Sequence, residues 1–343
     1  MNSKVRGSLL GGAIGDALGY QIEFRRNIKD KEVTRFKDKG IISDDTQMTL
    51  FTANALLWRD TNNINMSYCE AIYLGYLDWL DTQSNKKGDR CISWIKELSE
   101  LNVPRAPGNT CLTSLLSNKM GTIDKPINDS KGCGTVMRVA PIGLYLHDSF
   151  EAGKLASESS AITHGHPLGI IPSYVLASMI NLIVYKNLNI IDALNESINE
   201  MLKRYNIFNK RDTSYFIDLM NLAVKLSKSD LSDPEAIKEL GEGWVSEEAL
   251  AIAVYSCLKH QDSFEDTVVC AINHDGDSDS TGAVAGNIIG AYLGVESIPN
   301  YYLDNLELKD VICEMADDLV SKDTNNEYYK SKYKYSHKDI TKI

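Results

Sequence analysis

The sequence predicts an all-α fold in one compact domain, and three observations support this prediction. Apolar residues recur at three- and four-residue spacing through most of the 343 residues, whereas the alternating patterns of strands are scarce. Hydrophobic residues make up 43% of the chain, which is enough for a large core. No shift in composition interrupts the helical pattern, so we expect one helical domain over residues 1–322 and a Lys- and Tyr-rich tail over residues 323–343.

Helical periodicity runs through most of the chain, in segments that are separated by loops rich in Gly, Asn, Asp and Pro. The expected helices are residues 4–20, 48–59, 66–82, 90–100, 151–163, 168–186, 190–204, 213–228, 246–260, 280–294 and 303–321. The expected loops are residues 26–45, 60–65, 83–89, 103–134 and 229–245. The tail is expected to form either a short helix or a loosely packed arm.

Two series of glycines at four-residue spacing are the most informative structural feature. They are Gly7, Gly11, Gly15 and Gly19 in the first helix, and Gly282, Gly286, Gly290 and Gly294 in a late helix. Residues four apart share one helix face, and each glycine costs a helix about 1 kcal/mol relative to alanine, so each series needs a compensating gain. Close packing of helix backbones supplies such a gain. We therefore expect these two helices to pack against each other and to bring the adjacent loops together.

Charge and cysteine usage exclude several classes of protein. The formal net charge of −11 argues against a protein that binds the nucleic-acid backbone, because phosphates would be repelled. Seven cysteines without a C-x-x-C pair favour reduced thiols in a cytoplasmic protein over a disulfide framework or a zinc knuckle. Arg6 and Asp16 in the first glycine-rich helix argue against a membrane span, and no signal peptide is expected.

The first candidate site is the Ser-Asp-Asp-Thr-Gln segment at residues 43–47, directly before a predicted helix. A structural role stays open here, because Asp45 or Thr46 can cap that helix and Asp44 can complement its dipole.

The second candidate is the segment His-Asp-Gly-Asp-Ser-Asp-Ser-Thr-Gly at residues 274–282. Alternate aspartates repel one another unless a cation is present, and the alternation lets Asp277, Asp279 and the Ser280 hydroxyl face one ion. An EF-hand is excluded because the twelfth loop position from Asp275 is Gly286 instead of glutamate. Oxygen ligands favour Mg²⁺, Mn²⁺ or Ca²⁺, and the carboxylates of both candidates together exceed the charge of one ion. A two-metal hydrolase site is therefore the natural interpretation.

Three weaker candidates each retain a structural alternative. The small residues at 131–138 would let backbone N–H groups approach a phosphate, or they form an ordinary tight turn; no Walker A sequence follows. His164 and His166 either hydrogen-bond a ligand or serve the local structure. Glu23 follows the first glycine-rich helix and either faces the site or is solvated.

Taken together and in this order, these segments resemble the ADP-ribosylglycohydrolase family, and its arginine-type members most closely. The matching segments are Gly-Ala-Ile-Gly-Asp-Ala-Leu-Gly at 12–19 with Glu23, Ser-Asp-Asp-Thr at 43–46, Arg-Ala-Pro-Gly-Asn-Thr at 105–110, Gly-Cys-Gly-Thr-Val-Met-Arg-Val-Ala-Pro at 132–141, Thr-His-Gly-His-Pro at 163–167, Gly-Trp-Val-Ser-Glu-Glu-Ala-Leu at 243–250 and Gly-Asp-Ser-Asp-Ser-Thr-Gly at 276–282.

The resemblance implies an all-α fold around a central binuclear site for two Mg²⁺ ions, with Mn²⁺ as the alternative. The implied metal ligands are Ser43, Asp44, Asp45, Asp277, Asp279 and Ser280, with serine at two positions where the family often has threonine. The implied substrate-binding residues are Gly132, Cys133, Gly134 and Thr135 around the pyrophosphate, and His164 at ADP-ribose. Asp44 or Asp45 would accept a proton from water, and Glu23 would lie on a mobile loop over the site.

The implied reaction is magnesium-dependent hydrolysis of the N-glycosidic bond between ADP-ribose and a protein arginine. Serine-linked or O-acetyl-ADP-ribose stays open as the substrate, as does an immunity protein that reverses or blocks an ADP-ribosylating toxin. A non-catalytic ADP-ribose-binding module is the alternative from another class. The expected partner is an ADP-ribosylated protein, with such a toxin as the alternative; neither a nucleic acid nor a membrane is expected.

Overall fold

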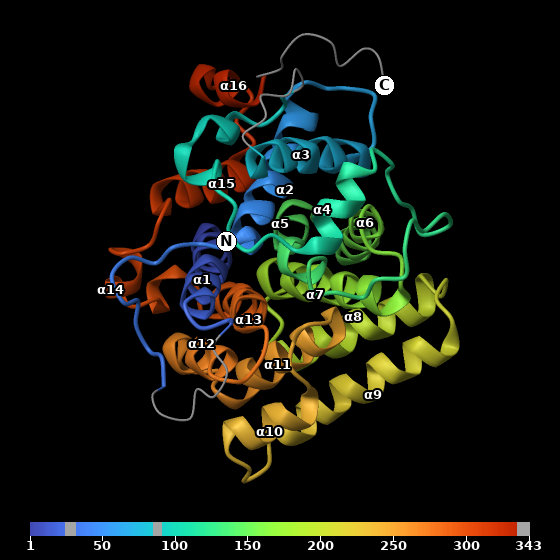
Figure 1. Ribbon diagram of the computed structural model, residues 1–343, viewed down its shortest axis with the longest axis vertical. Helices are drawn as coiled ribbons and strands as arrows, with labels where there is room; N and C mark the ends of the chain where they lie inside the picture. Colours follow the sequence, from blue (N-terminus) through green and yellow to red (C-terminus); the bar gives the residue numbers. More distant parts are fainter. Residues whose placement is uncertain (25–31, 85–90, 335–343) are drawn as a thin grey trace.

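The computed structural model describes residues 1–24, 32–84 and 91–334, and these residues form a helical body without β-strands (Figure 1). Within these ranges, extended backbone pairs only at two isolated bridges, between Gly40 and Leu306 and between Gly132 and Val245. The predicted all-α fold class is confirmed. Residues 26–31 and 85–89 of two expected loops, residue 90 of an expected helix and residues 335–343 of the tail lie outside the described residues.

The helices follow one another along the whole described chain. The α-helices are α1 (Asn2–Tyr20), α2 (Asp44–Thr61), α3 (Tyr68–Gln83), α4 (Asn109–Leu116), α5 (Ala140–Tyr145), α6 (Ser149–Ala161), α7 (Pro167–Lys186), α8 (Ile190–Arg204), α9 (Lys210–Leu226), α10 (Asp233–Leu240), α11 (Ser246–Lys259), α12 (Phe264–Ile272), α13 (Ser278–Leu293), α14 (Asn300–Leu303), α15 (Lys309–Ser321) and α16 (Glu327–Tyr333). The described 3₁₀ helices are η2 (Trp94–Glu97), η3 (Ser99–Leu101), η4 (Val136–Arg138) and η5 (Val295–Ser297).

Several expected boundaries are wrong, and local chemistry explains part of this. The expected helix at 90–100 contains two 3₁₀ turns, and the one expected at 303–321 begins only at Lys309, after Leu308 in the left-handed region with φ of 56°. Helix α10 lies inside an expected loop, where Ser232 and Glu235 form a capping box and a proline follows at the start of the helix. Helices α4, α5 and α12 were also missed.

Helices α1 and α13 pack backbone to backbone, as the glycine series predict. A Cβ atom on Gly15 would lie 2.0 Å from the carbonyl oxygen of Gly282, and one on Gly286 would lie 2.0 Å from that of Gly11. Any side chain larger than a hydrogen would therefore separate the two helices. Gly294 differs from the expectation, because it ends α13 with φ of 85° instead of continuing it.

The two helices run antiparallel, so the end of α1 meets the beginning of α13. Gly7 lies against Gly290, and a Cβ atom on Gly19 would lie 2.2 Å from the carbonyl oxygen of Ser278. The acidic segment before α13 is thereby placed beside the last turn of α1. The packing of these two helices thus places the second acidic segment of the candidate site.

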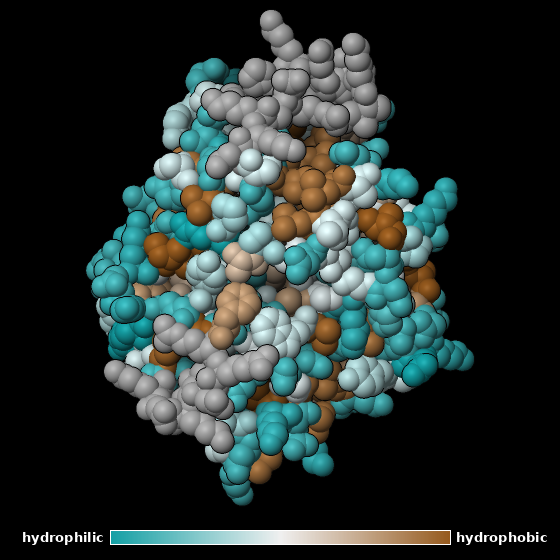
Figure 2. Space-filling model, viewed as in Figure 1, coloured by the Kyte–Doolittle hydropathy of each residue, from teal (hydrophilic) through white to brown (hydrophobic). Residues whose placement is uncertain are grey.

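The remaining helices bury the rest of the core around this pair. Helix α7 is long and apolar enough to cross a membrane by length and composition, but 94% of its apolar 18-residue window is buried inside the protein, as in the core helix of a globular domain. Helix α16 confirms the expectation of a short helix, and it packs through buried Tyr329, Lys332 and Tyr333. Figure 2 shows a mostly hydrophilic face with small groups of hydrophobic residues between.

Candidate metal centre

Asp16 joins α1 to the first acidic segment. Its carboxylate is fully buried and accepts hydrogen bonds from the N–H of Ser43, at 3.0 Å to each oxygen, and from the N–H of Thr46 at 3.1 Å. The Thr46 hydroxyl also donates to it. Burial raises the pKa of Asp16 to about 6, although these hydrogen bonds lower it. Sequence reasoning missed Asp16 as a site residue; an acid on an otherwise Gly-rich, apolar helix was the available signal.

The first acidic segment forms the start of α2, with both of its aspartates buried. Ser43 is the N-cap and its hydroxyl accepts the N–H of Asp45 at 3.2 Å, so the expectation that Asp45 or Thr46 caps the helix is wrong. Asp44 accepts the N–H of Gly108 at 3.1 Å. Oxygen Oδ2 of Asp45 is buried without a hydrogen-bond partner. The start of α2 therefore presents an unsatisfied carboxylate.

The second acidic segment forms the start of α13. Asp277 is the N-cap, and the N–H of Ser280 donates to Asp277 at 3.2 Å and to Asp279 at 2.9 Å. The Cys133 thiol donates to Asp277 at 2.7 Å. One carboxylate oxygen each from Glu23, Asp277 and Asp279 lie within 4.8 Å of one another. The antiparallel helix pair has thus brought Glu23 to the second segment.

These carboxylates are gathered without a cationic side chain. None of them makes a salt bridge to a lysine, arginine or histidine in the described parts of the chain. Burial first, and then neighbouring carboxylates, raise the pKa of Glu23 and of Asp44 to about 8 each. The same causes raise the pKa values of Asp45 and Asp279 well above their ordinary range.

The donor set fits a hard divalent cation. Carboxylate and hydroxyl oxygens are the ligands that Mg²⁺, Mn²⁺ and Ca²⁺ prefer. Glu23 Oε2 and Asp45 Oδ2 are buried and have no hydrogen-bond partner, so each has a free ligand position. Positive charge would also relieve the repulsion among the buried carboxylates. We call this cluster, which comprises residues 16, 23, 43–46 and 277–280, the acidic centre.

The glycine-rich loop, which comprises residues 132–135, lies directly against the acidic centre. Gly132 pairs with Val245, the N–H of Cys133 donates to the carbonyl of Trp244 at 3.2 Å, and the Ser246 hydroxyl donates to the carbonyl of Gly132 at 2.7 Å. Trp244 is 41% exposed, so this edge reaches the surface. The thiol contact of Cys133 links the loop to the second acidic segment.

The two histidines of the Thr-His-Gly-His-Pro segment have different surroundings. His164 is 1% exposed, and its ring lies 3.3 Å from where Cβ atoms on Gly132 and Gly134 would lie. His166 caps α7, where its Nδ1 accepts the N–H of Leu168 at 3.0 Å. His164 therefore belongs to the glycine-rich loop, whereas His166 has the structural role that the sequence left open. Thr135 is buried and its hydroxyl donates to the Gly169 carbonyl at 2.6 Å.

Comparison with known proteins agrees with this arrangement. The family model described as ADP-ribosylglycohydrolase matches residues 1–328. The chain belongs to the ADP-ribosylglycohydrolase family.

Three relatives of this glycohydrolase carry different names. The chain is 24% identical to the ADP-ribosyl-[dinitrogen reductase] glycohydrolase of Rhodospirillum rubrum, over 90% of this chain and 92% of the relative. It is 25% identical to ADP-ribosylhydrolase ARH3 of Danio rerio, over 87% of this chain and 85% of that relative. It is 23% identical to the ADP-ribosylarginine hydrolase Tri1 of Serratia proteamaculans, over 92% and 78%. Hydrolase activity is thus supported, while the names differ in the substrate.

A solved structure supports the fold. An ADP-ribosylglycohydrolase-related protein complex matches with a TM-score of 0.64 and 22% identity, over 94% of this chain and 98% of that one. The family is generally metal-dependent, and the acidic centre of this glycohydrolase provides groups that can hold a metal.

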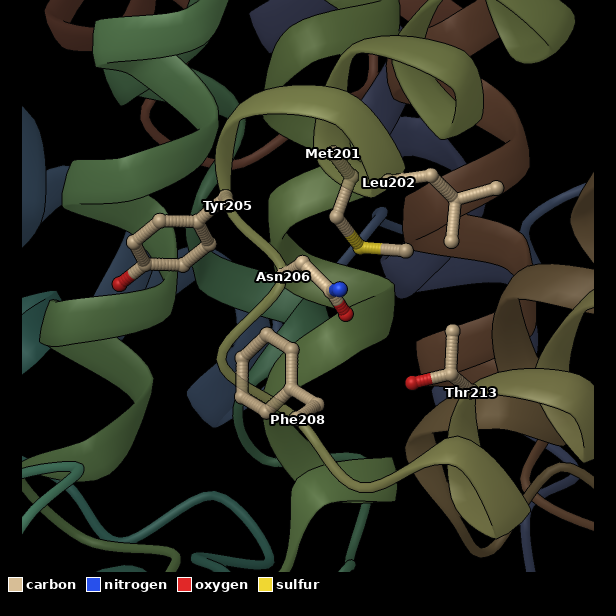
Figure 3. Close-up of a pocket in the computed structure, with 6 residues that line it drawn as sticks. All are labelled: Met201, Leu202, Tyr205, Asn206, Phe208 and Thr213. Carbon is tan, nitrogen blue, oxygen red and sulfur yellow. The ribbon is translucent and has the colours of Figure 1, made fainter.

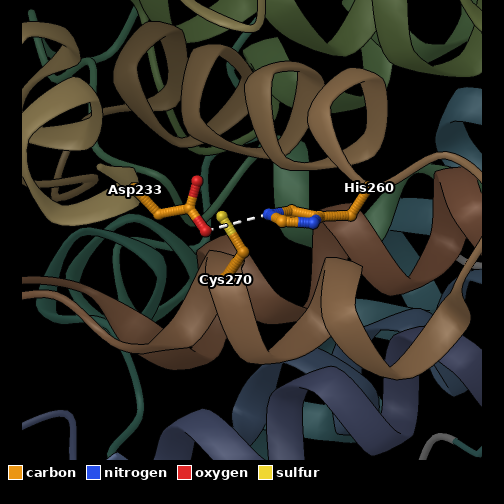
Figure 4. Close-up of side chains that lie close together, drawn as sticks. All are labelled: Asp233, His260 and Cys270. Atoms are coloured by element: carbon orange, nitrogen blue, oxygen red, sulfur yellow. Dashed lines mark hydrogen bonds and ion pairs between the residues drawn. The ribbon is translucent and has the colours of Figure 1, made fainter. Parts of the chain in front are cut away.

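Two other places in this glycohydrolase lack the properties of the acidic centre. A small hollow at the turn between α8 and α9 is lined by Met201, Leu202, Tyr205, Asn206, Phe208 and Thr213, with no acid or base (Figure 3). Asp233, His260 and Cys270 form a second group of potential ligands (Figure 4). There, His260 Nε2 lies 2.8 Å from Asp233, and the Tyr255 hydroxyl donates to Asp233 at 2.7 Å. This group is internally satisfied and connects α10 to α11 and α12.

Proposed function

We propose that this glycohydrolase removes ADP-ribose from protein arginine by magnesium-dependent hydrolysis of the N-glycosidic bond. The observation that carries the proposal is the buried acidic centre, whose carboxylates have no cationic partner and adjoin the glycine-rich loop. The residues that would hold two Mg²⁺ ions, or Mn²⁺ instead, are Ser43, Asp44, Asp45, Asp277, Asp279 and Ser280. Bound Mg²⁺ supplies positive charge that orients ribose hydroxyls and acidifies water.

The chain's own groups account for binding and proton transfer. The Gly132–Thr135 loop would receive the pyrophosphate at backbone N–H groups other than that of Cys133, which is bonded to Trp244, and His164 behind the loop would contact it. A water oxygen forms the new bond to the anomeric carbon while the bond to the guanidine nitrogen breaks. Asp44 or Asp45 would accept the water proton and pass it to the departing guanidine nitrogen, so that the leaving arginine ends protonated. Glu23, at the edge of the same centre, would assist this transfer.

Arginine is the proposed leaving group for two reasons. The Ser-Asp-Asp-Thr and Gly-Asp-Ser-Asp-Ser-Thr-Gly segments resemble arginine-type members of the family most closely. One matched relative carries arginine in its name. We further propose an ADP-ribosylated protein as the partner, with an ADP-ribosylating toxin as the alternative partner, and a cytoplasmic location that suits the free cysteines.

The test is a hydrolysis assay on three defined substrates. The protein is incubated with arginine-linked and serine-linked ADP-ribosyl peptides and with O-acetyl-ADP-ribose, each with Mg²⁺ or with a chelator. We expect free ADP-ribose from the arginine substrate only, and only with Mg²⁺. Release of ADP-ribose from only one of the other two substrates would show that the leaving group is not arginine. Undiminished release in the presence of the chelator would refute the metal requirement.

A further inference from the structure

Arg138 is a fully buried cation without a carboxylate partner. It is 0% exposed, and no salt bridge within the described residues involves it. Its guanidinium lies 4.3 Å from the ring centre of Tyr76 and donates to the Ser159 carbonyl at 3.4 Å and to the Thr163 hydroxyl at 2.8 Å. Burying a charge in this way is costly, so the contacts that Arg138 makes call for a specific role.

The contact with Thr163 assigns the direction of a hydrogen-bond chain. A guanidinium can only donate, so the Thr163 oxygen accepts from Arg138. The same Thr163 oxygen lies 2.8 Å from Nδ1 of His164. If Nδ1 carried a proton, the buried Thr163 hydroxyl would have two donors and no acceptor, which costs about 1–3 kcal/mol. Thr163 therefore donates to Nδ1, and the single ring proton of His164 resides on Nε2.

The protonated Nε2 of His164 points at the glycine-rich loop. Nε2 lies 3.3 Å from where a Cβ atom on Gly132 would lie, and it hydrogen-bonds no other described residue. Burial, and then the charge of Arg138, lower the pKa of His164 to about 3, so the ring stays neutral and retains one tautomer. The N–H of a ring that is only 1% exposed, and that no protein acceptor meets, thus faces Gly132 and Gly134, which have no side chains to fill the space before it.

We propose that Arg138 and Thr163 are positioning residues that hold His164 in its Nε2–H tautomer, and thereby make it a dedicated hydrogen-bond donor to a phosphate at the Gly132–Gly134 loop. The second half of this proposal rests on the proposed function, because it takes ADP-ribose as the ligand. The first half concerns the free protein alone. Without the hydrogen bonds from Arg138 to Thr163 and from Thr163 to His164, the ring proton would be shared between the two nitrogens. Nε2 would then present an acceptor to the phosphate part of the time.

Nitrogen NMR of the free protein with ¹⁵N-labelled histidine tests the first half. His164→Gln identifies the His164 signals, and the two ring nitrogens then report the tautomer directly. We expect the Nε2–H form in the wild type and in Thr163→Ser, which keeps the hydroxyl, and a mixture in Thr163→Val. An Nδ1–H form or a cation in the wild type would overturn the proposal, as would an unchanged tautomer in Thr163→Val. If Thr163→Val does not fold, the tautomer seen in the wild-type spectrum still tests the first half of the proposal.

Calorimetric binding of ADP-ribose tests the second half. We expect Thr163→Val to weaken binding about tenfold, which corresponds to about 1.4 kcal/mol, and Thr163→Ser to bind within about twofold of the wild type. Thr122→Val, at an exposed threonine, is the matched control and should bind like the wild type. Equal affinity of Thr163→Val and the wild type would overturn the donor role. A wild type that does not bind ADP-ribose would refute the proposed function instead, and the tautomer result would still stand.

Discussion

Among the described residues, two groups of side chains place potential metal-ligand atoms close together, and they differ in how their charges are satisfied. The acidic centre gathers buried carboxylates of one sign, and Glu23 and Asp45 each have an oxygen without a partner. The second group, Asp233 with His260 and Cys270, is partly exposed, with 29% of the Asp233 side chain and 26% of the His260 side chain accessible. Its carboxylate already accepts hydrogen bonds from His260 and Tyr255.

The comparison shows that proximity of ligand atoms is a poor criterion for a metal site. Both groups place three ligand atoms within 4.8 Å of one another. Hydrogen bonding lowers the pKa of Asp233, chiefly through His260, whereas burial raises the pKa of Asp44 to about 8. A carboxylate that hydrogen bonds within the protein already stabilise as an anion gains less from a bound metal ion. Unsatisfied buried charge therefore distinguishes the acidic centre.

The largest expected effect is the loss of hydrolysis in Asp279→Asn. An amide cannot supply the charge of a buried ligand, so we expect release of ADP-ribose to fall about 10³-fold, in the range measured when one essential electrostatic group is removed. The rate of release under saturating Mg²⁺ is the measurement. Asp45→Asn should behave in the same way.

The matched control for Asp279→Asn is Asp275→Asn, an exposed aspartate in the same loop. It should hydrolyse the substrate like the wild type, and Asp233→Asn should as well. Both site variants should keep the wild-type circular dichroism spectrum. Hydrolysis that is mostly retained in Asp279→Asn, or lost in Asp233→Asn, would contradict the assignment of the metal site to the acidic centre.

Addition of Mg²⁺ should stabilise the folded protein through the acidic centre only. An ion that binds the folded state alone contributes about 2.7 kcal/mol at one hundred times its dissociation constant. We expect thermal denaturation of the wild type and of Asp233→Asn to shift upward with Mg²⁺, and that of Asp279→Asn to shift little. An equal shift in all three proteins would place the bound ion elsewhere.

Alanine in the glycine series should damage the acidic centre without touching a ligand. In Gly15→Ala the new Cβ would lie 2.0 Å from the carbonyl oxygen of Gly282, and such overpacking costs about 1–3 kcal/mol. Urea denaturation should show this loss, and the affinity for Mg²⁺ should fall with it. Gly108→Ala is the control for the urea measurement of stability, since its Cβ would meet nothing nearer than 3.8 Å. Equal stability of both variants would argue against the helix contact as the support of the site.

The smallest expected effect concerns the second group. Because its partners hold the folded-state pKa of Asp233 below the ordinary 3.8, its stabilising effect is complete above that pH and is lost as the pH falls through the folded-state pKa. Asp233→Asn should therefore be less stable than the wild type at pH 6, by under about 1 kcal/mol for a partly exposed pair. The difference should vanish in strong acid. Urea denaturation of both proteins from pH 6 downward measures it, and a difference that grows in acid would contradict the sign.

The sequence allowed the centre of the fold to be predicted because backbone contact leaves a periodic signature. Gly11 and Gly286 destabilise their helices unless another backbone packs closely against them. Their regular spacing can therefore be recognised in the sequence as a sign of such packing. Asp16 was not recognised as part of the site, because the sequence does not show that its carboxylate is buried against the start of α2. Helices α4 and α5 were missed because they are short, and short apolar runs carry little periodicity.

Long-range groups were beyond sequence reasoning for a different reason. Asp233 lies on α10, His260 directly after α11 and Cys270 on α12, and no spacing rule connects them. The same holds for Arg138 and Thr163, whose hydrogen bond depends on how α6 meets η4. The capping role of Ser43 was within reach, since serine is a preferred N-cap, but the following aspartates and threonine are comparable candidates.

The antiparallel pair of α1 and α13 also bears on how the chain folds during synthesis. The Ser8 hydroxyl donates to the carbonyl of Asn287 across 279 positions of the sequence. Helix α1 therefore emerges from the ribosome long before the surface that covers its glycine face exists. Contacts of such sequence separation slow folding, because a large loop must close before they form. We expect the acidic centre to be among the last parts of the protein to assemble, and chains interrupted before α13 to present an uncovered first helix to chaperones and proteases.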